Sequence, residues 1–311
     1  MPHPKHPAPT TAAPPASSRD YLQAIPQYLY PQHLLSALMW RAARIRSPRI
    51  KDRLIRWFIR AYRVDMREAA NPDPTAYASF NHFFTRALHP DARVSPKIAA
   101  PSAGAVLSPA DGHISQFGPI DQGRILQAKG REYSTAELLQ GNATDSAPFL
   151  GGQFMTIYLS PRDYHRVHMP VAGRLGEMRY VPGRLFSVNA STTRVIPRLF
   201  ARNERVVFLF DTEIGPMALV MVGAIFVGSI DTVWAGTITP ARRRAIHAWQ
   251  YGDEQQTEFT FERGQEIGRF NMGSTVILLL PPDSVTWAPP LHPGMPIKMG
   301  TVMGESLKFE V

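Results

Sequence analysis

The sequence predicts an α+β fold in which N-terminal amphipathic helices lie on a mostly antiparallel β core, barrel-like or sandwich-like in form. Together, the 22 Gly and 29 Pro residues among 311 exceed average usage, which favours many turns and short strands over a helical bundle. Helical periodicity is confined to the N-terminal third, whereas later apolar stretches are about 4–8 residues long between Gly, Pro, Asn or Asp. No long helices separate those stretches, and this disfavours a parallel β-α-β architecture.

The N-terminal end of the chain has the composition of a disordered segment. Residues 1–20 contain six prolines and no apolar run. A secretory signal peptide needs an apolar stretch of roughly 7–15 residues, so we predict a disordered, Pro-rich tail instead. The longest apolar run, near residues 217–227, is shorter than the roughly 18 residues of a membrane-spanning helix, and no transmembrane segment is predicted.

Residues 21–100 are predicted to form a helical, membrane-associating region. Two helices are expected between residues 31 and 64, separated at Ser47-Pro48 because proline ends or restarts a helix. This segment carries nine basic side chains against the single acid Asp52, and such a block calls for a polyanionic partner. The second helix combines an apolar set, Ile50, Leu54, Trp57, Phe58 and Tyr62, with a basic set, Arg53, Arg56, Arg60 and Arg63.

This pattern has two interpretations. It is typical of a helix lying in a membrane interface, where each Lys or Arg near an anionic leaflet contributes about 1 kcal/mol. It is equally compatible with an apolar stripe that packs on the protein's own core while the arginines face solvent. Nucleic acid is not an expected partner, because no nucleic-acid-binding motif accompanies the charge.

Residues 101–311 are predicted to form a β-rich catalytic domain. Ahead of it, one more short helix is predicted from side chains that recur at helical spacing: Tyr77, Phe80, Phe84 and Leu88. Ser134 and Glu137 have the spacing of a capping box, which predicts a two-turn helix ending near Gly141. Strands are predicted at residues 154–159, 206–211, 219–222, 232–237, 258–261 and 275–280.

Three places carry residue types that catalysis uses. Asp111 lies in a turn flanked by Pro and Gly, and His165 and His168 lie in the stretch YHRVHMP. Gly273 leaves the peptide bond before Ser274 sterically open, so an attack of the Ser274 Oγ on the Gly273 carbonyl is feasible. The sequence contains no Cys, which excludes disulfides, Cys-ligated metal sites and thiol nucleophiles, and we expect no metal site.

The sequence leaves the geometry of these residues open. In an extended strand His165 and His168 point to opposite sides, whereas one helical turn brings them together. Asp111, His168 and Ser274 supply an acid, a base and a hydroxyl, which is compatible with a catalytic triad because triads are defined by geometry. The Gly-x-Ser-x-Gly elbow of serine hydrolases is absent around Ser274.

Six longer strings follow one another along the chain after the segment Phe83-Phe84-Thr85-Arg86. They are SPADG (108–112), YHRVHMP (164–170), PGRLFSVN (182–189), LFARNERV (199–206), VGSIDTVWAGTITP (227–240) and GRFNMGSTV (268–276). With these strings, the chain resembles the bacterial-type, pyruvoyl-dependent phosphatidylserine decarboxylases, which are made as proenzymes. The resemblance extends to about residue 277. Where Met272 stands, that family most often has Leu, of similar volume.

The resemblance implies decarboxylation of phosphatidylserine to phosphatidylethanolamine and CO2 through a Schiff base with a pyruvoyl group. That group would come from autocatalytic serinolysis at Gly273-Ser274, so Ser274 itself would become the pyruvoyl and no diffusible cofactor would be needed. Asp111 would orient His168, His168 would take the proton from Ser274, and His165 would protonate the carbanion left by CO2. The products of cleavage would be a β chain, residues 1–273, and an α chain, residues 274–311.

The resemblance also implies partners and a location. We expect the two chains to stay together as a heterodimer, with further dimerisation left open, and to bind an anionic phospholipid surface peripherally on the cytoplasmic side of the cell membrane. The contacts would come from residues 34–64, with Arg242-Arg243-Arg244 in addition. Three alternatives remain: a serine hydrolase with an intact Asp111/His168/Ser274 triad, a non-catalytic lipid-binding protein, and a pyruvoyl decarboxylase acting on a soluble amino acid.

Overall fold

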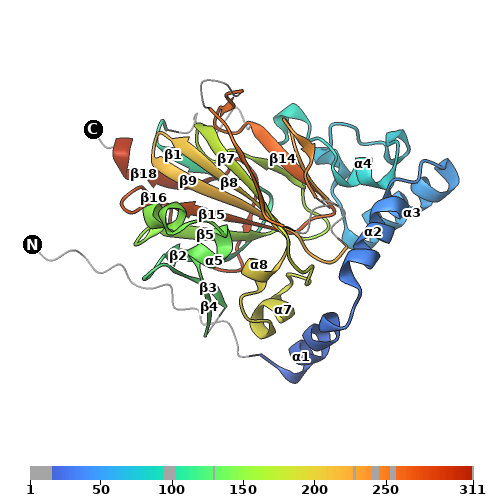
Figure 1. The fold of residues 1–311 in the computed structure, drawn as a ribbon. Helices are drawn as coiled ribbons and strands as arrows, with labels where there is room; N and C mark the ends of the chain where they lie inside the picture. The colour runs from blue at the N-terminus through green and yellow to red at the C-terminus, as the bar shows by residue number, and fades with distance from the viewer. Residues whose placement is uncertain are drawn as a thin grey trace, which may run out of the picture.

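The computed structural model describes residues 16–93, 102–128, 130–226, 229–239, 245–252 and 257–309. Figure 1 shows β-sheets at the centre of the molecule and the N-terminal helices along one side of them. The predicted tail lies mostly outside the described residues, but its predicted end at residue 20 is wrong. Helix α1 (Ser18–Ala24) begins earlier, because the Ser17 hydroxyl accepts from the Asp20 N–H and the Asp20 carboxylate accepts from the Ser17 N–H.

The two predicted helices are present as α2 (Gln32–Ala43) and α3 (Pro48–Tyr62), with Pro48 at the first position of α3. The apolar side chains of α3 fit both interpretations of this helix, since some pack on the protein's own core and others face outward. Phe58 is buried against α4 (Phe80–Phe84), whereas Trp57 is 58% exposed. No helix within the described ranges is both long and apolar enough to cross a membrane.

Helix α4 is shorter than predicted. It ends at Phe84, and Leu88 instead pairs with Ala69 in an isolated β-bridge. The Thr85 hydroxyl bonds the Asn81 carbonyl, and the backbone leaves the helix there. The 3-10 turns of this N-terminal region are Ile25–Tyr28, Met66–Glu68, Pro74–Ala76 and Pro90–Ala92.

The largest sheet has nine strands, all paired antiparallel, which confirms the predicted sheet type. Its order is β12-β7-β8-β9-β15-β5-β2-β17, with β13 beside β7, and it does not close into a barrel in the described part of the chain. The strands are β2 (Gly112–Pro119), β5 (Gln153–Tyr158), β7 (Gly173–Val181), β8 (Arg205–Thr212), β9 (Gly215–Val222), β12 (His247–Gln250), β13 (Thr260–Phe261), β15 (Thr275–Leu280) and β17 (Pro296–Ile297). Strand β15 has the predicted bounds, is buried along its whole length and lies between β9 and β5.

Three smaller sheets complete the core. The first joins β11 (Gly236–Thr237), β10 (Ser229–Thr232), β14 (Glu266–Asn271) and β6 (Arg166–His168); the second joins β1 (Ala105–Leu107), β18 (Val302–Ser306) and β16 (Val285–Trp287); the third is the hairpin of β3 (Arg124–Ala128) and β4 (Arg131–Ser134). The predicted strand at residues 232–237 is wrong. A turn interrupts it: the Ala235 N–H donates a hydrogen bond to the Thr232 hydroxyl, and Gly236 adopts a left-handed φ of 67°.

Short helices connect the strands. The capping box predicted at Ser134 and Glu137 is confirmed and starts α5 (Thr135–Leu139), which ends at Gln140 in a left-handed conformation, one residue before Gly141. Three short elements were not predicted: α6 (Ala143–Ser146), α7 (Ala190–Val195) and α8 (Leu199–Arg202). Two 3-10 turns lie at Ala147–Phe149 and Leu307–Phe309.

Candidate active site

The chain turns sharply between β14 and β15, at residues 272–274. Met272 has a φ of 84°, in the left-handed region that a residue with a Cβ rarely adopts. Such a conformation costs about 1–3 kcal/mol and persists only where the surroundings impose it. Here the Ser274 carbonyl accepts from the Leu159 N–H at 2.8 Å, and the Asn271 side chain bonds the Ser229 hydroxyl and the Asn81 amide. The strained residue therefore directly precedes the Gly273-Ser274 bond.

Ser274 is buried, and its Oγ has no hydrogen-bond partner in the described chain. A buried hydroxyl without a partner costs about 1–3 kcal/mol of desolvation, so it contributes nothing to the stability of the fold. Gly273 beside it lies under an imidazole: a Cβ added at Gly273 would lie 2.1 Å from Cε1 and 2.3 Å from Nδ1 of His165. Only glycine fits at this position, and the contact places His165 at the Gly273-Ser274 peptide bond.

His165 is fully buried and stacks on Phe84, with ring centroids 4.1 Å apart. Its Nε2 lies 3.4 Å from the Pro161 carbonyl, and its Nδ1 has no partner among the residues placed by the structure. Burial lowers the pKa of His165, and the positive charge of Arg86 lowers it further, to about 3. The imidazole is therefore neutral near pH 7, the form in which a ring nitrogen can accept a proton.

His168 has different surroundings, as expected for an extended chain at this point. Its Nδ1 lies 2.8 Å from the Gly264 carbonyl, which can only accept, so Nδ1 carries the proton. Its Nε2 then accepts from the Tyr164 hydroxyl at 2.9 Å. Burial lowers the pKa of His168. Both ring nitrogens are occupied, and no contact with Ser274 is made in the described part of the molecule.

Asp111 does not contact His168 among the described residues. Its carboxylate accepts from the Arg93 guanidinium, whose Nε lies at 3.2 Å, and from the Met299 N–H at 2.8 Å, with Lys298 Nζ at 3.5 Å. Arg93 also bonds Glu68 at 3.0 Å. The predicted orientation of His168 by Asp111 is not seen in this structure, because the guanidinium and the backbone N–H satisfy the carboxylate.

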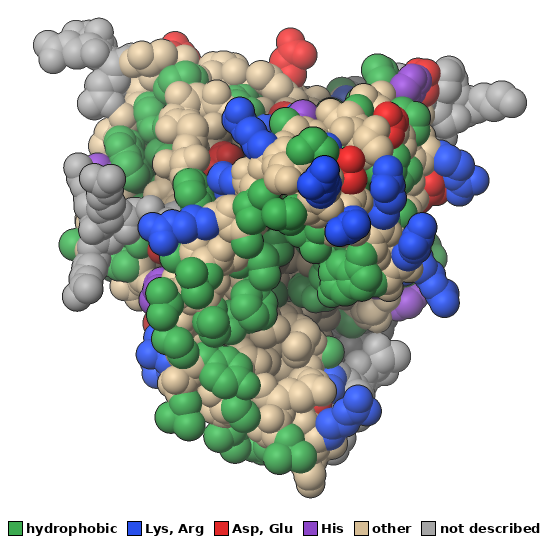
Figure 2. All heavy atoms as spheres, turned by 90° about the vertical axis from the view of Figure 1, so that its right-hand side faces the viewer, with side chains coloured by type: hydrophobic (Ala, Val, Ile, Leu, Met, Phe, Trp, Pro, Cys, Tyr) green, Lys and Arg blue, Asp and Glu red, His purple; other side chains and the backbone are tan. Residues whose placement is uncertain are grey.

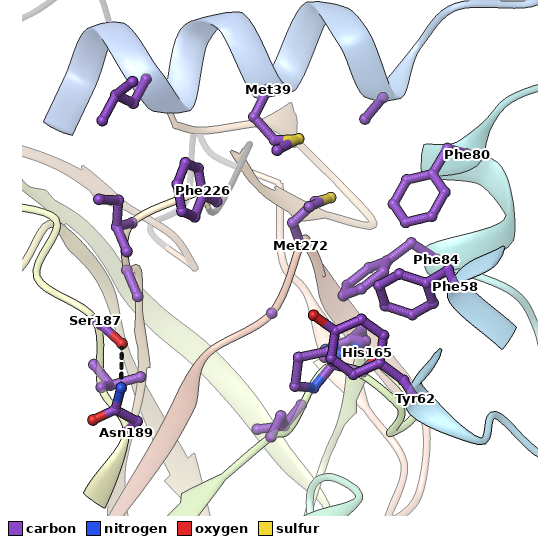
Figure 3. Close-up of a pocket in the computed structure, with 18 of the residues that line it drawn as sticks. Met39, Phe58, Tyr62, Phe80, Phe84, His165, Ser187, Asn189, Phe226 and Met272 are labelled. Carbon is purple, nitrogen blue, oxygen red and sulfur yellow. Dashed lines mark hydrogen bonds between the residues drawn. The ribbon is translucent and has the colours of Figure 1, made fainter. Parts of the chain in front are cut away.

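A cavity of about 710 Å³ opens beside Gly273, between the N-terminal helices and the β core. Figure 3 shows Met39 of α2 and Met272 pointing toward one another, and aromatic rings gathered around His165. Ser187 and Asn189 lie on the opposite side from His165 and share a hydrogen bond of 3.1 Å. The aromatic side chains of the lining include Phe58, Tyr62, Phe80, Phe84, Tyr158 and Phe226. The site is thus an apolar cavity with few polar groups, of the size and kind that binds a hydrophobic ligand.

Sequence reasoning found Gly273, Ser274 and His165 but missed the polar pair Ser187 and Asn189. Both belong to the string PGRLFSVN, which marked the segment without indicating that Ser187 and Asn189 line the same cavity as Gly273. No group of three or more His, Asp or Glu side chains that could hold a metal is present in the described ranges.

The outer surface of the helices is unusually apolar. Figure 2 shows hydrophobic side chains gathered on this face around a hollow, with Lys and Arg along the upper part of the face. The large apolar side chains exposed on α1, α2, α3 and the segments between them include Leu22, Ile25, Leu29, Leu34, Leu38, Ile50 and Trp57. A soluble monomer rarely exposes a contiguous apolar patch of this kind without a function for it.

The sequence matches one family of known proteins along most of its length. A family profile described as phosphatidylserine decarboxylase matches residues 80–305, and a second, described as PSD, matches residues 22–63. A phosphatidylserine decarboxylase proenzyme of Stutzerimonas stutzeri is 54% identical over 288 residues, covering 93% of this chain and 95% of the relative. Proenzymes of the same name from Pseudomonas paraeruginosa and Bordetella bronchiseptica are 57% and 56% identical, covering 91% and 92% of this chain and 96% and 94% of the relatives. By these matches, the chain belongs to the phosphatidylserine decarboxylase family.

Proposed function

We propose that this protein cuts its own chain between Gly273 and Ser274 and then decarboxylates phosphatidylserine to phosphatidylethanolamine and CO2. One observation carries the proposal: the buried, unpartnered Ser274 Oγ follows directly on Gly273, against which the buried His165 packs, beside an apolar cavity. Membership of the family supports the reaction.

The first reaction is an internal acyl shift followed by elimination. The Ser274 Oγ attacks the Gly273 carbonyl carbon, the C–N bond breaks, and the amide becomes an ester with a free Ser274 amine. His165 takes the proton from Oγ and returns it to the leaving nitrogen. Loss of the Ser274 Cα proton and rupture of its Cβ–Oγ bond then free the Gly273 carboxylate and leave a dehydroalanine, which water converts to a pyruvoyl group and ammonia.

We assign the proton transfer to His165, although the family resemblance gives it to His168. His165 lies against Gly273 with a free ring nitrogen, whereas the nitrogens of His168 are bonded to Tyr164 and Gly264. The left-handed Met272 adds to the driving force, since a cut after Gly273 lets its strain relax.

Asp111 then has a different role. It binds Met299 and Lys298, which belong to the smaller chain after cleavage, and so joins the two products. Strand β15 of the smaller chain is buried between two strands of the larger one. We therefore infer that the α and β chains remain a heterodimer.

The residues around position 274 fit a pyruvoyl group. In the described part of the chain, no hydrogen bond holds the Ser274 side chain, which would lose its Oγ, and the ketone would form at the Ser274 Cα; His165 fills the space that a side chain at 273 would need. When formed, this group supplies the carbonyl that takes up the substrate amine and withdraws the electron pair left by CO2. The apolar cavity would hold the lipid substrate and keep water from it. Ser187 and Asn189 offer hydrogen bonds to the substrate on the side opposite His165. His165 then delivers a proton to the carbon that lost CO2.

The intact mass of the purified protein tests self-cleavage. We expect two chains, one ending at Gly273 and one of 38 residues, 274–311, which lacks a free amino terminus and reacts with carbonyl probes. Release of CO2 from phosphatidylserine vesicles, but not from free serine, is expected for the lipid substrate. An uncut chain with esterase activity would instead indicate the serine hydrolase.

We further propose that the apolar face of the helices docks peripherally on the cytoplasmic leaflet of the cell membrane. Its anionic lipids attract Arg53, Arg56, Arg60 and Arg63, all of which are exposed on or directly after α3. The exposed apolar side chains around the cavity mouth then bring the cavity to the substrate. The predicted contribution of Arg242-Arg243-Arg244 lies outside the described residues.

Replacing Arg53, Arg56, Arg60 and Arg63 by Gln is expected to weaken co-sedimentation with anionic vesicles at least tenfold at low salt. Each cation near an anionic leaflet contributes about 1 kcal/mol to binding. The difference should shrink as the salt concentration rises. A control variant removes the same charge elsewhere on the surface, at Arg124, Arg174, Arg198 and Lys308. Equal sedimentation of the two variants would contradict docking by α3 and would leave the catalytic proposal intact.

A further inference from the structure

We propose that Gln27 and Gln32 are positioning residues for the lipid headgroup: their carboxamides hold the segment that places Ser187 and Asn189 in the cavity. The N-terminal helices then shape the headgroup site in addition to docking on the membrane. The inference rests on the proposed function, since it takes phosphatidylserine as the occupant of the cavity. Gln27 lies in the 3-10 turn Ile25–Tyr28, and Gln32 is the first residue of α2.

The segment of residues 182–188 lies between β7 and α7 and forms no strand, apart from one isolated bridge. Its middle is buried, so the backbone N–H groups there need acceptors within the protein. The Leu185 N–H donates to Oε1 of Gln32 at 2.9 Å. The Ser187 N–H donates to Oε1 of Gln27 at 2.8 Å. Side chains of the N-terminal helices thus do for this segment what a neighbouring strand does within a sheet.

Each of these carboxamides is itself fixed, because both of its ends are used. Gln27 and Gln32 are buried, and their Nε2 groups donate to the carbonyls of Gln23 and Gln27 at 2.9 and 2.8 Å. From the core side, Asn203 bonds the N–H of Phe186 at 3.1 Å and its carbonyl at 2.8 Å. The segment is held between the core and the helices, and loss of either glutamine acceptor would leave a buried N–H that must move to find another.

The contact between the helices and the segment also runs in the other direction. The His33 Nε2 lies 3.1 Å from the Gly183 carbonyl, and Nη2 of Arg184 donates to the Tyr28 carbonyl at 3.0 Å. Four hydrogen bonds therefore join the 3-10 turn and the start of α2 to this segment. The elements that we place on the membrane also set the position of this part of the cavity wall.

Ser187 and Asn189 line the cavity as hydrogen-bond donors. The Asn189 Oδ1 accepts from the Thr192 N–H at 3.0 Å, so its Nδ2 is left to bond the Ser187 Oγ at 3.1 Å (Figure 3). One N–H of Nδ2 and the Ser187 O–H remain, with no acceptor in the described chain. The phosphate and carboxylate oxygens of phosphatidylserine only accept hydrogen bonds. Because the described part of the lining contains no Lys or Arg, such neutral donors are what the cavity offers an acidic headgroup.

The kinetics of the processed, full-length protein test this role. The substrate is a short-chain phosphatidylserine dissolved below its micelle concentration, so that docking on a membrane does not enter the rate. Gln27→Met and Gln32→Met keep the length of the side chain but remove the acceptor. We expect KM to rise about threefold to tenfold and kcat to stay within about twofold, because the headgroup bonds stabilise the bound substrate and the transition state alike.

Two controls accompany these variants. Gln153→Met removes a glutamine acceptor at the end of β5 remote from the cavity, where Gln153 bonds the Trp287 indole at 3.2 Å, and this variant should keep the wild-type KM. Co-sedimentation of the Gln27 and Gln32 variants with anionic vesicles should equal that of wild type, since the exposed side chains of the docking face are unchanged.

Gln27 itself lines the cavity, so a direct contact with the substrate is the rival explanation of a raised KM. A double-mutant cycle with Ser187→Ala separates the two. If Gln27 acts through the segment, the double variant should raise KM by less than the product of the two single effects, because part of what Gln27 positions is already gone. Single effects that multiply would overturn the inference.

The remaining outcomes are distinct. A wild-type KM in both glutamine variants, or a loss of rate confined to kcat, would overturn the inference while the proposed function stands. Absence of CO2 release by the wild-type protein, from the short-chain lipid and from vesicles, would refute the proposed function instead. Should Gln27→Met not fold or not be cut, as judged by thermal unfolding and intact mass, Gln32→Met decides: a raised KM supports the inference and an unchanged KM refutes it.

Discussion

Ser274→Ala is expected to leave the chain uncut at its full 311 residues and to abolish decarboxylation. Alanine has no oxygen to attack the Gly273 carbonyl, so neither the ester nor the pyruvoyl group can form. Folding should not suffer, since the Ser274 Oγ makes no hydrogen bond in the described chain and its removal relieves a desolvation cost. Intact mass, CO2 release from phosphatidylserine vesicles and thermal unfolding would measure the three effects.

Ser284→Ala is the matched control for this variant. Ser284 is also buried and belongs to the same C-terminal 38 residues, but its hydroxyl donates to the Pro281 carbonyl at 2.7 Å. We expect this variant to be cut and active, with a loss of about 1 kcal/mol in the free energy of unfolding. If wild type and Ser274→Ala bound phosphatidylserine vesicles equally and neither released CO2, the enzyme mechanism would be refuted in favour of a lipid-binding role.

His165→Ala is expected to slow self-cleavage by about a hundredfold to ten-thousandfold, the usual contribution of a positioned acid–base group. His165→Asn, which keeps more of the volume against Phe84 but cannot accept the proton, should be equally slow. His168→Ala should have a smaller effect, because this ring bonds Tyr164 and Gly264 and not the cleavage site. The rate of appearance of the 38-residue chain would compare all three.

The exposed His292 provides a control, since His292→Ala should cut at the wild-type rate. The reverse ranking, with His168→Ala uncut and His165→Ala cut normally, would contradict our assignment. It would indicate that Asp111 and His168 come together in a conformation other than the one described here, as the family resemblance implies.

Much of the fold follows from local sequence patterns. The break at Pro48 and the apolar run of β15 were sufficient to predict two helices and the central strand. Strand β7 was missed because charged residues interrupt its pattern. Its Arg179 is buried all the same, since Asp145 and the Leu139 carbonyl bond it. Those partners lie 34 and 40 residues away in the sequence, where periodicity cannot reveal them.

In the candidate site, too, the features set by local sequence were predicted and those set by distant contacts were not. Gly273, Ser274 and His165 were singled out by residue type and local setting, and the family resemblance supplied their roles. The surroundings of Asp111 were not predictable, because Arg93 and Met299 lie 18 and 188 residues from it along the chain. The cavity was also beyond sequence reasoning, since it forms only where the N-terminal helices meet the β core.

The burial of β15 between β5 and β9 has a consequence for the lifetime of the protein. Before the cut, β15 is joined to the rest of the chain, so after unfolding it re-enters the sheet in an intramolecular step, at a high effective concentration. After the cut it is a separate polypeptide, so denaturation becomes dissociation and the apparent melting temperature depends on dilution. With the proposed cleavage, the protein would fold once as a single chain and would not readily reassemble after its two chains are diluted apart.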